Sequence, residues 1–106
     1  MILDTMNMKE RTLSYHDFME SVEEGGILVD LRDDGQTQFG GIPGAVRIPA
    51  TQLWKLYELP EQERIYLYCQ KGEISGEILE LMADAGYDAY ELEGGYLSYL
   101  QNMSEP

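Results

Sequence analysis

The chain has 106 residues, of which 43% are hydrophobic, and a formal net charge of −13. This length and composition predict one folded domain over residues 1–106 and exclude a disordered chain. The strong negative charge argues against nucleic acid and against anionic membranes as partners, because both are polyanions. The sequence has no apolar run near the roughly 20 residues of a membrane span and no signal-peptide pattern at its start, so we expect a cytoplasmic protein.

The first third of the chain predicts a helix and then a buried strand. Residues 1–10 are weakly patterned and are expected to form a loose lead or a short edge strand. A capping-box spacing opens at Ser14, and apolar residues then recur at helical spacing until Gly25 ends the helix. The nearly continuous apolar run 27–31 predicts a central strand buried on both faces. The polar, glycine-rich segment 32–41 predicts a loop.

Two short elements are predicted in the middle of the chain. Residues 45–48 have the character of a short strand. Residues 51–59 predict a short helix, with Leu53, Trp54 and Tyr57 as its inner face. In this arrangement Trp54 anchors the core and does not contact a ligand.

The second half of the chain repeats the alternation of strand and helix. Residues 65–69 predict a second buried strand, Ser75 opens and caps the helix after it, and residues 88–92 predict a further strand. The last helix covers residues 94–101, and residues 102–106 are expected to fray as a tail. Strands that alternate with helices in this way predict an α/β domain of three layers, in which helices flank a mainly parallel central sheet.

Reactive groups of such a sheet lie beyond the carboxyl ends of its strands. Two predicted strand ends carry distinctive residues: Asp30 and Arg32 at one, and Cys69 at the other. Cys69 is the only cysteine and His16 the only histidine, which excludes an internal disulfide and argues against a metal site. A reactive thiol and an inert buried thiol remain as interpretations, and the position at a strand end favours the reactive one.

The loop after Cys69 is suited to activating a thiol. It consists of Gln70, Lys71, Gly72, Glu73 and Ile74, with Ser75 opening the next helix. In a short loop of this kind, backbone N–H groups, here those from Gln70 to Ser75, point inward near the positive end of a helix. They stabilise a thiolate and would equally stabilise a persulfide anion. Lys71 adds positive charge and Glu73 subtracts it, so we expect the backbone to supply most of the effect.

Four segments of the sequence resemble the rhodanese family, and they all lie within residues 14–100. Residues 28–32 resemble its first signature, a strand that ends in Asp-x-Arg. Residues 40–49 resemble its second, Gly-His-Ile-Pro-Gly-Ala followed by a short strand and a proline. Residues 66–74 resemble the active-site signature, and residues 91–95 resemble the Gly-Gly turn that opens the last helix. Each motif alone is weak, but four in the right order at the right intervals make a strong match.

The resemblance implies a rhodanese-like fold and sulfurtransferase chemistry. The thiolate of Cys69 would take a sulfane sulfur from a donor, hold it as a persulfide and pass it to a thiol or to cyanide, with no metal and no organic cofactor. The loop from Cys69 to Ile74 has six residues, as in sulfurtransferase members, whereas phosphatase relatives have one residue more. The positions of Asp30 and Arg32 are ones that brace the cysteine loop in the family, and we expect that role here.

Three departures from the family pattern bear on the sulfur donor. Ile74 and Gln70 stand where arginine is frequent, and Gly41 stands where the second signature has histidine. The Cys-x-Lys-Gly core does resemble thiosulfate-using members, and Lys71 is the expected donor-facing charge. Because guanidinium groups that would grip an anion are missing and the chain is strongly negative, we expect a small persulfide, a polysulfide or a partner protein's persulfide as donor. A thiol is the expected acceptor.

A second class of function stays open: a catalytically degenerate rhodanese module that binds a partner, or that senses sulfide or redox state through Cys69. The missing loop arginine, the charge of Glu73 and the acidic composition favour this module, whereas the retained cysteine and the loop length favour the enzyme. The direction of Glu73 distinguishes the two, because a carboxylate that points into the loop opposes a thiolate there.

Overall fold

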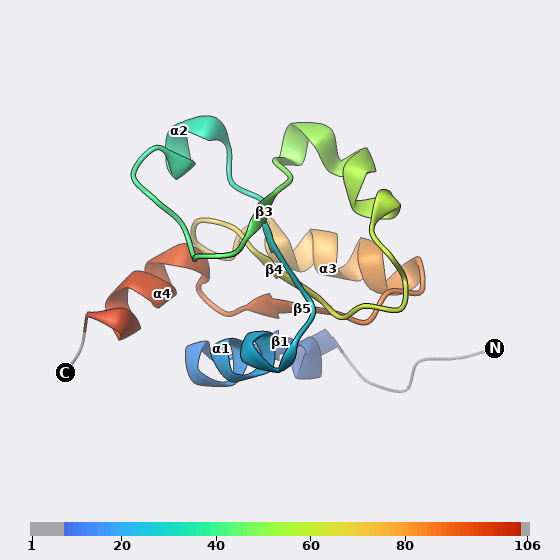
Figure 1. The fold of residues 1–106 in the computed structure, drawn as a ribbon, viewed down its shortest axis with the longest axis horizontal. Helices are drawn as coiled ribbons and strands as arrows, with labels where there is room; N and C mark the ends of the chain where they lie inside the picture. Colours follow the sequence, from blue (N-terminus) through green and yellow to red (C-terminus); the bar gives the residue numbers. More distant parts are fainter. Residues whose placement is uncertain (1–7, 105–106) are drawn as a thin grey trace.

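A five-stranded parallel sheet forms the centre of the computed structural model, which describes residues 8–104 (Figure 1). The strands are β1 (Thr12–Leu13), β2 (Ile27–Asp30), β3 (Val46–Arg47), β4 (Ile65–Tyr68) and β5 (Ala89–Leu92), in the order β1-β5-β4-β2-β3. The helices are the 3-10 helices η1 (Met8–Arg11) and η2 (Ala50–Glu58) and the α-helices α1 (Tyr15–Glu24), α2 (Asp34–Thr37), α3 (Ser75–Asp84) and α4 (Gly95–Met103). Among the described residues, no helix is long and apolar enough to span a membrane. The expected α/β fold with a parallel central sheet is confirmed.

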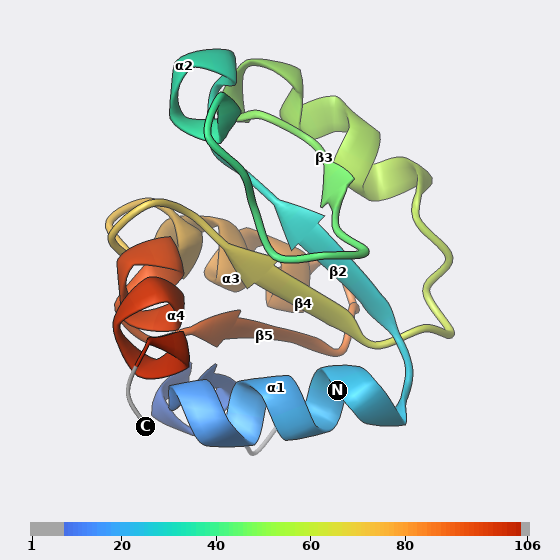
Figure 2. The same ribbon diagram turned by 60° about the vertical axis from the view of Figure 1, so that its left-hand side comes forward.

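Helices cover both faces of the sheet, and the side chains of β4 alternate between the two. Ile65 and Leu67 pack on the face that α3 and η2 cover, whereas Tyr66 and Tyr68 pack on the face that α1 and α4 cover. In Figure 2, α1 and α4 lie in front of the strands and α3 lies behind them. All four side chains are buried. Full burial of an aliphatic side chain such as Leu67 contributes about 1.5–3 kcal/mol, so β4 anchors both layers of the core.

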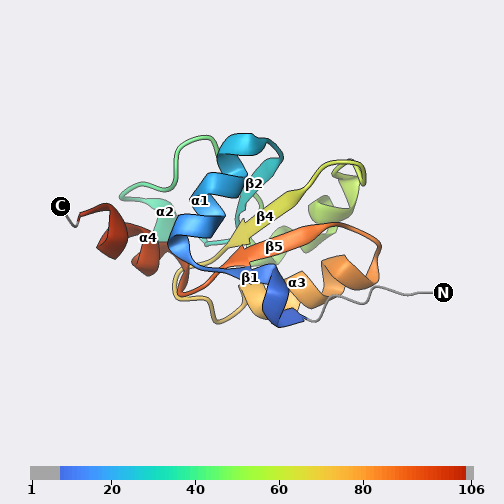
Figure 3. The same ribbon diagram turned by 90° about the horizontal axis from the view of Figure 1, so that it is seen from below.

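The carboxyl ends of the strands point to one side of the molecule. The arrowheads of β2, β4 and β5 in Figure 2 point toward the loop after β4, the helix α2 and the start of α4. Figure 3 gives the view from below, with α1 over the near face of the sheet. Asp30 is the register partner of Tyr68, so the end of β2 lies beside the residue that precedes Cys69.

The helix α1 begins and ends where the sequence indicates. The Oγ of Ser14 accepts a hydrogen bond from the Asp17 amide at 3.3 Å, and Gly25 forms the C-cap with a φ of +123°. Phe18 is the buried residue of this helix and packs edge-on against Tyr66, with ring centroids 5.7 Å apart. The cap and the apolar spacing therefore act together, as the sequence predicts.

The segment 32–41, predicted as a loop, contains the short helix α2. Asp33 and Gln36 form a complete capping box in which the Asp33 carboxylate accepts from the Gln36 amide at 2.9 Å. The Gln36 side chain accepts in return from the Asp33 amide at 3.3 Å. The prediction was wrong because it followed the glycine content of the segment, whereas the Asp-x-x-Gln spacing is a helix-start signal.

The element predicted as a helix in the middle of the chain is the 3-10 helix η2, and its inner face differs from the expectation. A 3-10 helix has three residues per turn, so every third residue shares a face. Leu56 is buried, and Leu53 and Leu59 pack beside it against the core. Trp54 is 60% exposed and Tyr57 is 53% exposed. The assignment of Trp54 as a core anchor was therefore wrong.

The N-terminal lead predicted at residues 1–10 contains regular structure in its described part. The 3-10 helix η1 begins within the lead, and the edge strand β1 follows directly after it. This strand pairs in parallel with β5, so it closes one edge of the sheet. Residues 1–7 of the lead lie outside the described residues.

The tail predicted at residues 102–106 is helical at its start. The helix α4 continues to Met103, and the side chain of Asn102 donates to the Ser98 carbonyl at 2.8 Å. The prediction of a frayed tail is wrong for these two residues, because the helix continues through them to the C-cap Ser104, whose amide donates to the Leu100 carbonyl at 3.2 Å. Residues 105–106 lie outside the described part of the chain.

Candidate active site

Cys69 lies directly after β4, at the carboxyl edge of the sheet, and is 1% exposed. It belongs to the buried cluster between the sheet and α3, which includes Leu67 and Ile78. The backbone N–H of Gly72 points back at this residue and donates a hydrogen bond to Sγ at 3.1 Å. A fixed N–H donor at this distance favours an anionic sulfur, whether thiolate or persulfide.

Gly72 gives the loop the turn that this contact requires. Its φ of +89° lies in the left-handed region, which costs an L-residue roughly 1–2 kcal/mol. A Cβ at this position would also meet the amide nitrogen of Gly94 at 3.3 Å. The cysteine loop therefore lies against the turn that precedes α4, and both the backbone angle and the space favour glycine.

The first turn of α4 is hydrogen-bonded to the cysteine loop. The Tyr96 amide donates to the Cys69 carbonyl at 2.8 Å, and the Leu97 amide donates to the Gln70 carbonyl at 3.1 Å. These bonds satisfy N–H groups that the start of a helix leaves without intrahelical partners. They also hold the backbone of Cys69 in place.

The side chain of Glu73 folds back over its own loop. Its Oε1 accepts a hydrogen bond from the Lys71 amide at 3.0 Å. Hydrogen bonds from the Lys71 amide, from its own amide and from the Cys69 thiol lower the pKa of Glu73. The side chain of Lys71 is exposed. The N–H groups of the loop are therefore divided between the sulfur, which accepts from Gly72, and a carboxylate, which accepts from Lys71.

The last two residues predicted to contact substrate are turned inward. Ile74 is the N-cap residue of α3, and its side chain packs against the core. Ser75 is fully buried and donates its hydroxyl to Oε1 of Glu91 at 2.5 Å. The expectation that Ser75 caps α3 was wrong, because its hydroxyl is bound to this buried carboxylate. Thr12 donates to the other oxygen of Glu91 at 2.8 Å, so Glu91 joins β1, β5 and α3.

Asp30 and Arg32 form a buried, bidentate ion pair at the end of β2. The Nε of Arg32 donates to Oδ1 of Asp30 at 3.0 Å, and Nη2 donates to Oδ2 at 2.8 Å. Burial acts to lower the pKa of Arg32, but the hydrogen bond and the charge of Asp30 outweigh it, and the pKa is raised. The guanidinium also donates to the carbonyls of Gln36 and Gly40, at 3.1 and 2.7 Å. Arg32 therefore ties the segment around α2 to the edge of the sheet.

Arg32 also reaches the cysteine loop. Its Nη1 donates to Oε1 of Gln70 at 3.3 Å, so the side chain next to Cys69 is directed at Arg32. The guanidinium lies over the ring of Tyr96, with its central carbon 4.0 Å from the ring centroid. The structure therefore brings the two predicted strand ends, the cysteine loop and the start of α4 together.

Tyr68 and Glu91 contribute to this site, although the sequence reading treated the first as packing and did not single out the second. The Tyr68 hydroxyl donates to Oδ2 of Asp30 at 2.8 Å and accepts from the Ile42 amide at 3.0 Å. Burial raises the pKa of Tyr68, which keeps the hydroxyl protonated as a donor. Both residues carry a signal in the sequence: each is a polar group within a buried strand, where it needs a partner.

Gly41, which stands where the family signature has histidine, lies against the same ion pair. A Cβ at this position would meet Nη2 of Arg32 at 2.9 Å and Oδ2 of Asp30 at 3.2 Å. Arg32 and Asp30 thus fill the space that a larger residue would take. This departure from the family pattern is accommodated by the way the ion pair packs.

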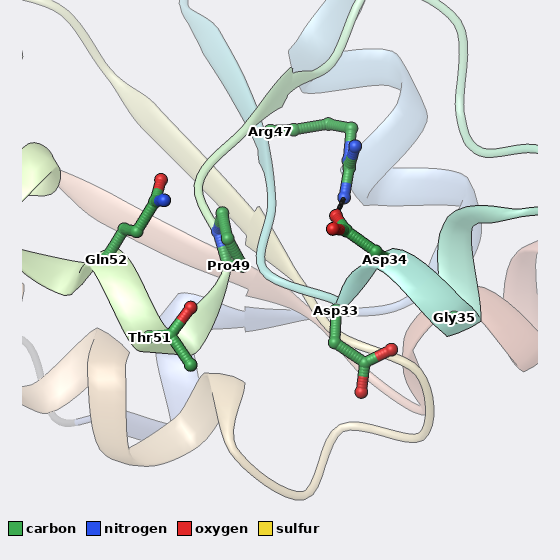
Figure 4. Close-up of a pocket in the computed structure, with 7 residues that line it drawn as sticks. All are labelled: Asp33, Asp34, Gly35, Arg47, Pro49, Thr51 and Gln52. Carbon is green, nitrogen blue, oxygen red and sulfur yellow. Dashed lines mark hydrogen bonds and ion pairs between the residues drawn. The ribbon is translucent and has the colours of Figure 1, made fainter.

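A cavity of about 470 Å³ opens beside the ends of β2 and β3 (Figure 4). It is lined by Asp33, Asp34, Gly35, Arg47, Pro49, Thr51 and Gln52. In Figure 4 the side chain of Arg47 points at Asp34, and the two form an ion pair. None of the lining residues belongs to the cysteine loop, so the cavity is separate from the candidate sulfur site.

Cys69 lies in an apolar cluster, and its sulfur contacts a backbone amide and the Glu73 carboxylate but no imidazole. His16 is exposed on α1, where its Nε2 lies 3.3 Å from a carboxylate oxygen of Glu20. Within residues 8–104, no three His, Cys, Asp or Glu side chains lie close enough together to hold a metal ion. The polar groups that contact the Cys69 sulfur therefore come from its own loop.

The fold and the site together define a class of protein: a parallel α/β domain in which a cysteine follows a central strand and its loop leads into a helix. Comparison with known families identifies residues 14–102 as a rhodanese-like domain. The chain belongs to the rhodanese-like domain family, as its sequence motifs indicate.

Individual proteins and solved structures of this family are also similar to the chain. The chain is 33% identical over 79 residues to the tRNA sulfurtransferase of Pyrobaculum aerophilum, covering 73% of this chain and 16% of the relative. Among solved structures it is similar to reduced CoADR-RHD of Bacillus anthracis, with 31% identity, a TM-score of 0.76 and coverage of 83% of this chain and 16% of that one. A rhodanese-related protein of Thermoplasma volcanium, 24% identical with a TM-score of 0.81, shares the fold over 91% of this chain and 95% of its own. The chain thus spans 16% of the length of each of the first two proteins.

Proposed function

We propose that the protein is a sulfurtransferase that carries a sulfane sulfur on Cys69. The observation that carries the proposal is the Gly72 amide, 3.1 Å from the Cys69 sulfur, in a six-residue loop at the carboxyl edge of the sheet. Such a donor stabilises the anionic sulfur of a thiolate and of a persulfide. Membership of the rhodanese-like family and relatives named as sulfurtransferases support the same chemistry.

Two displacements at sulfur complete the proposed transfer. In the first, the Cys69 thiolate attacks the outer sulfur of a donor R–S–S–H. The S–S bond of the donor breaks, R–S⁻ leaves with the bonding electron pair and takes up a proton, and Cys69 holds the persulfide Cys–S–S–H. In the second, an acceptor thiolate attacks the outer sulfur of this persulfide, leaves with it as a new persulfide, and frees the Cys69 thiolate.

The proposed donor is a small organic persulfide, a polysulfide or a persulfide on a partner protein, and the proposed acceptor is a thiol. Lys71 is the one basic side chain in the loop and it is exposed, which suits it to face the donor. The side chain of Gln70 is directed at Arg32 and leaves Lys71 alone in that role. A net charge of −13 repels a doubly charged donor such as thiosulfate.

Asp30 and Arg32 are proposed as positioning residues. Their ion pair lies beneath the loop, and Arg32 holds the Gln70 side chain next to Cys69. A guanidinium with several fixed acceptors has little freedom to move, so the pair keeps the loop backbone in the geometry that aims the Gly72 amide at sulfur. Neither residue has a role in the bond-breaking steps.

Two observations favour a second candidate function. The carboxylate of Glu73 accepts a hydrogen bond from the Lys71 amide and contacts Cys69. Cys69 is also buried. A nearby carboxylate disfavours a thiolate. A degenerate rhodanese module that binds a partner, or that senses sulfide or redox state, tolerates both features.

Thiocyanate formation separates the two functions. The wild-type protein and Cys69→Ser are each incubated with a panel of donors, namely an organic persulfide, polysulfide and thiosulfate, with cyanide as acceptor. If the protein is a sulfurtransferase, the wild type is expected to form thiocyanate in repeated turnovers with at least one donor. Cys69→Ser is then expected to form thiocyanate only at the background rate. If protein with a confirmed free thiol forms no thiocyanate from any donor, the binding or sensing module is the better account.

A further inference from the structure

The exposed Glu73 side chain folds back over the cysteine loop and brings its carboxylate to the Cys69 sulfur. It accepts the Lys71 amide at 3.0 Å, within the same loop whose Gly72 amide donates to the Cys69 sulfur at 3.1 Å. Its hydrogen bonds with the Lys71 amide, its own amide and the Cys69 thiol lower the pKa of Glu73, so the group is negatively charged at neutral pH. The loop therefore already holds one anion beside the sulfur.

An oxyanion donor needs the same amides. Backbone N–H groups at a loop that leads into a helix are the usual binding groups for small oxyanions. Here the amide of Lys71 is bound to Glu73. An incoming oxyanion must displace this carboxylate or lie against it without a hydrogen bond, and either event is unfavourable because the two charges repel.

We propose that Glu73 determines the donor specificity of this site: its carboxylate occupies the amides that an oxyanion would use, so that the loop takes sulfur from organic persulfides and rejects thiosulfate. This inference rests on the proposed sulfurtransferase function and adds the residue that selects the class of donor.

The chemistry of the two donors explains why one carboxylate separates them. When the Cys69 thiolate attacks the outer sulfur of thiosulfate, the S–S bond breaks and sulfite leaves as a dianion, with Cys–S–S⁻ left on the protein. This leaving group carries its two charges on oxygen atoms that seek N–H donors. When the donor is R–S–S–H, the leaving group is R–S⁻, which carries one charge on sulfur and takes up a proton. Glu73 opposes the first departure far more than the second.

The test compares three proteins with two donors. The proteins are the wild type, Glu73→Gln and Glu77→Gln, and the donors are thiosulfate and the persulfide of uncharged N-acetylcysteamine, with cyanide as common acceptor. Glutamine keeps the shape and the acceptor oxygen of Glu73 and removes its charge. Glu77 is exposed in the first turn of α3, so Glu77→Gln removes the same charge from the neighbourhood without touching the loop amides.

Glu73→Gln is expected to raise kcat/KM for thiosulfate by about tenfold, the effect of one unit charge removed at close range. The same variant is expected to change kcat/KM for the persulfide by less than about threefold, and Glu77→Gln to change neither donor by more than that. The ratio of the two donors is thus the decisive quantity.

Two results overturn the inference while the sulfurtransferase function stands. One is an unchanged ratio of kcat/KM for the two donors in Glu73→Gln. The other is an equal rise of kcat/KM for thiosulfate in Glu73→Gln and Glu77→Gln, which would assign the effect to the electrostatic field of the whole protein. A different result removes the function itself. If no variant transfers sulfur from either donor and Cys69 stays unmodified by mass, the sulfurtransferase proposal fails and the specificity role fails with it.

Discussion

Gly95, the first residue of α4, lies against the backbone of Cys69 and Gln70. Its φ is +64°, and a Cβ built there would lie 2.5 Å from the carbonyl oxygen of Cys69 and 2.8 Å from that of Gln70. Backbone atoms cannot yield as the tip of a flexible side chain can. Any side chain at this position must therefore push the helix and the cysteine loop apart.

Gly95→Ala is expected to lower the free energy of unfolding by roughly 2–5 kcal/mol, from backbone strain together with overpacking. It is also expected to slow sulfur loading of Cys69, because the Tyr96 amide loses its bond to the Cys69 carbonyl. The matched control is Gly86→Ala, where φ is +94° but the nearest atom to a Cβ is a Glu61 carboxylate oxygen at 3.8 Å. Urea unfolding and the loading rate check both variants, and equal effects on loading would contradict the account.

At the scale of elements, the ion pair of Asp30 and Arg32 joins β2, the segment around α2 and the cysteine loop. Arg32 is fully buried and makes bonds to Asp30, to two backbone carbonyls and to Gln70. Tyr68 donates to the same carboxylate from β4. Loss of one charge leaves the other buried without compensation, which is the costly event for a desolvated pair.

Asp30→Asn is expected to lower the free energy of unfolding by about 3–5 kcal/mol, the size found when one partner of a buried pair is removed. Arg32→Met should cost a similar amount, and the double variant should cost clearly less than the sum of the two. Chemical denaturation of the three variants measures this coupling. Additive losses would show that the two residues do not act as a pair.

Much of the element pattern is readable from the sequence because local signals and burial agree. The apolar runs at 27–31 and 65–69 predict strands, because a strand in the centre of the sheet buries side chains on both of its faces. The cap at Ser14 predicts the start of α1. The inner face of η2 cannot be predicted in the same way. A 3-10 helix repeats every three residues, and the sequence pattern does not distinguish this period from the 3.6 residues of an α-helix. Trp54 was misplaced for this reason.

Part of the candidate site can likewise be predicted from the sequence, and part cannot. The motif spacing locates Cys69, its loop and the pair at the end of β2, because these follow from strand order and the carboxyl edge of a parallel sheet. The use of the Ser75 hydroxyl by Glu91 depends on a contact between elements distant in the chain, and the direction of the Glu73 side chain depends on the exact backbone path of its own loop. Neither composition nor periodicity encodes such contacts, so only the structure reveals them.

At the scale of the whole molecule, the net charge of −13 acts on every charged donor before it reaches the loop. Raising the salt from about 0.01 to about 0.1 M shortens the screening length from roughly 30 to roughly 10 Å. The rate constant for loading of Cys69 by thiosulfate is therefore expected to rise by about threefold or more over this range. The rate of attack on an uncharged organic trisulfide R–S–S–S–R, which leaves Cys69 as Cys–S–S–S–R and releases R–S⁻, should stay nearly constant.

Stopped-flow measurement of loading at several salt concentrations checks this dependence. A thiosulfate rate that falls with salt would show that a local cationic site, such as Lys71, outweighs the field of the molecule. Because the trisulfide carries no charge, it reports any effect of salt on the protein itself.

The central claim is that Cys69 carries a transferable sulfur, and intact-mass measurement of the loaded protein tests it most directly. The wild type is treated briefly with an organic persulfide, weighed, treated with cyanide and weighed again, beside Cys69→Ser. The account predicts a gain of one sulfur atom on the wild type, its removal by cyanide with release of thiocyanate, and no gain on the serine variant. A wild-type protein with a free thiol that gains no sulfur, or a gain that persists in Cys69→Ser, would contradict it.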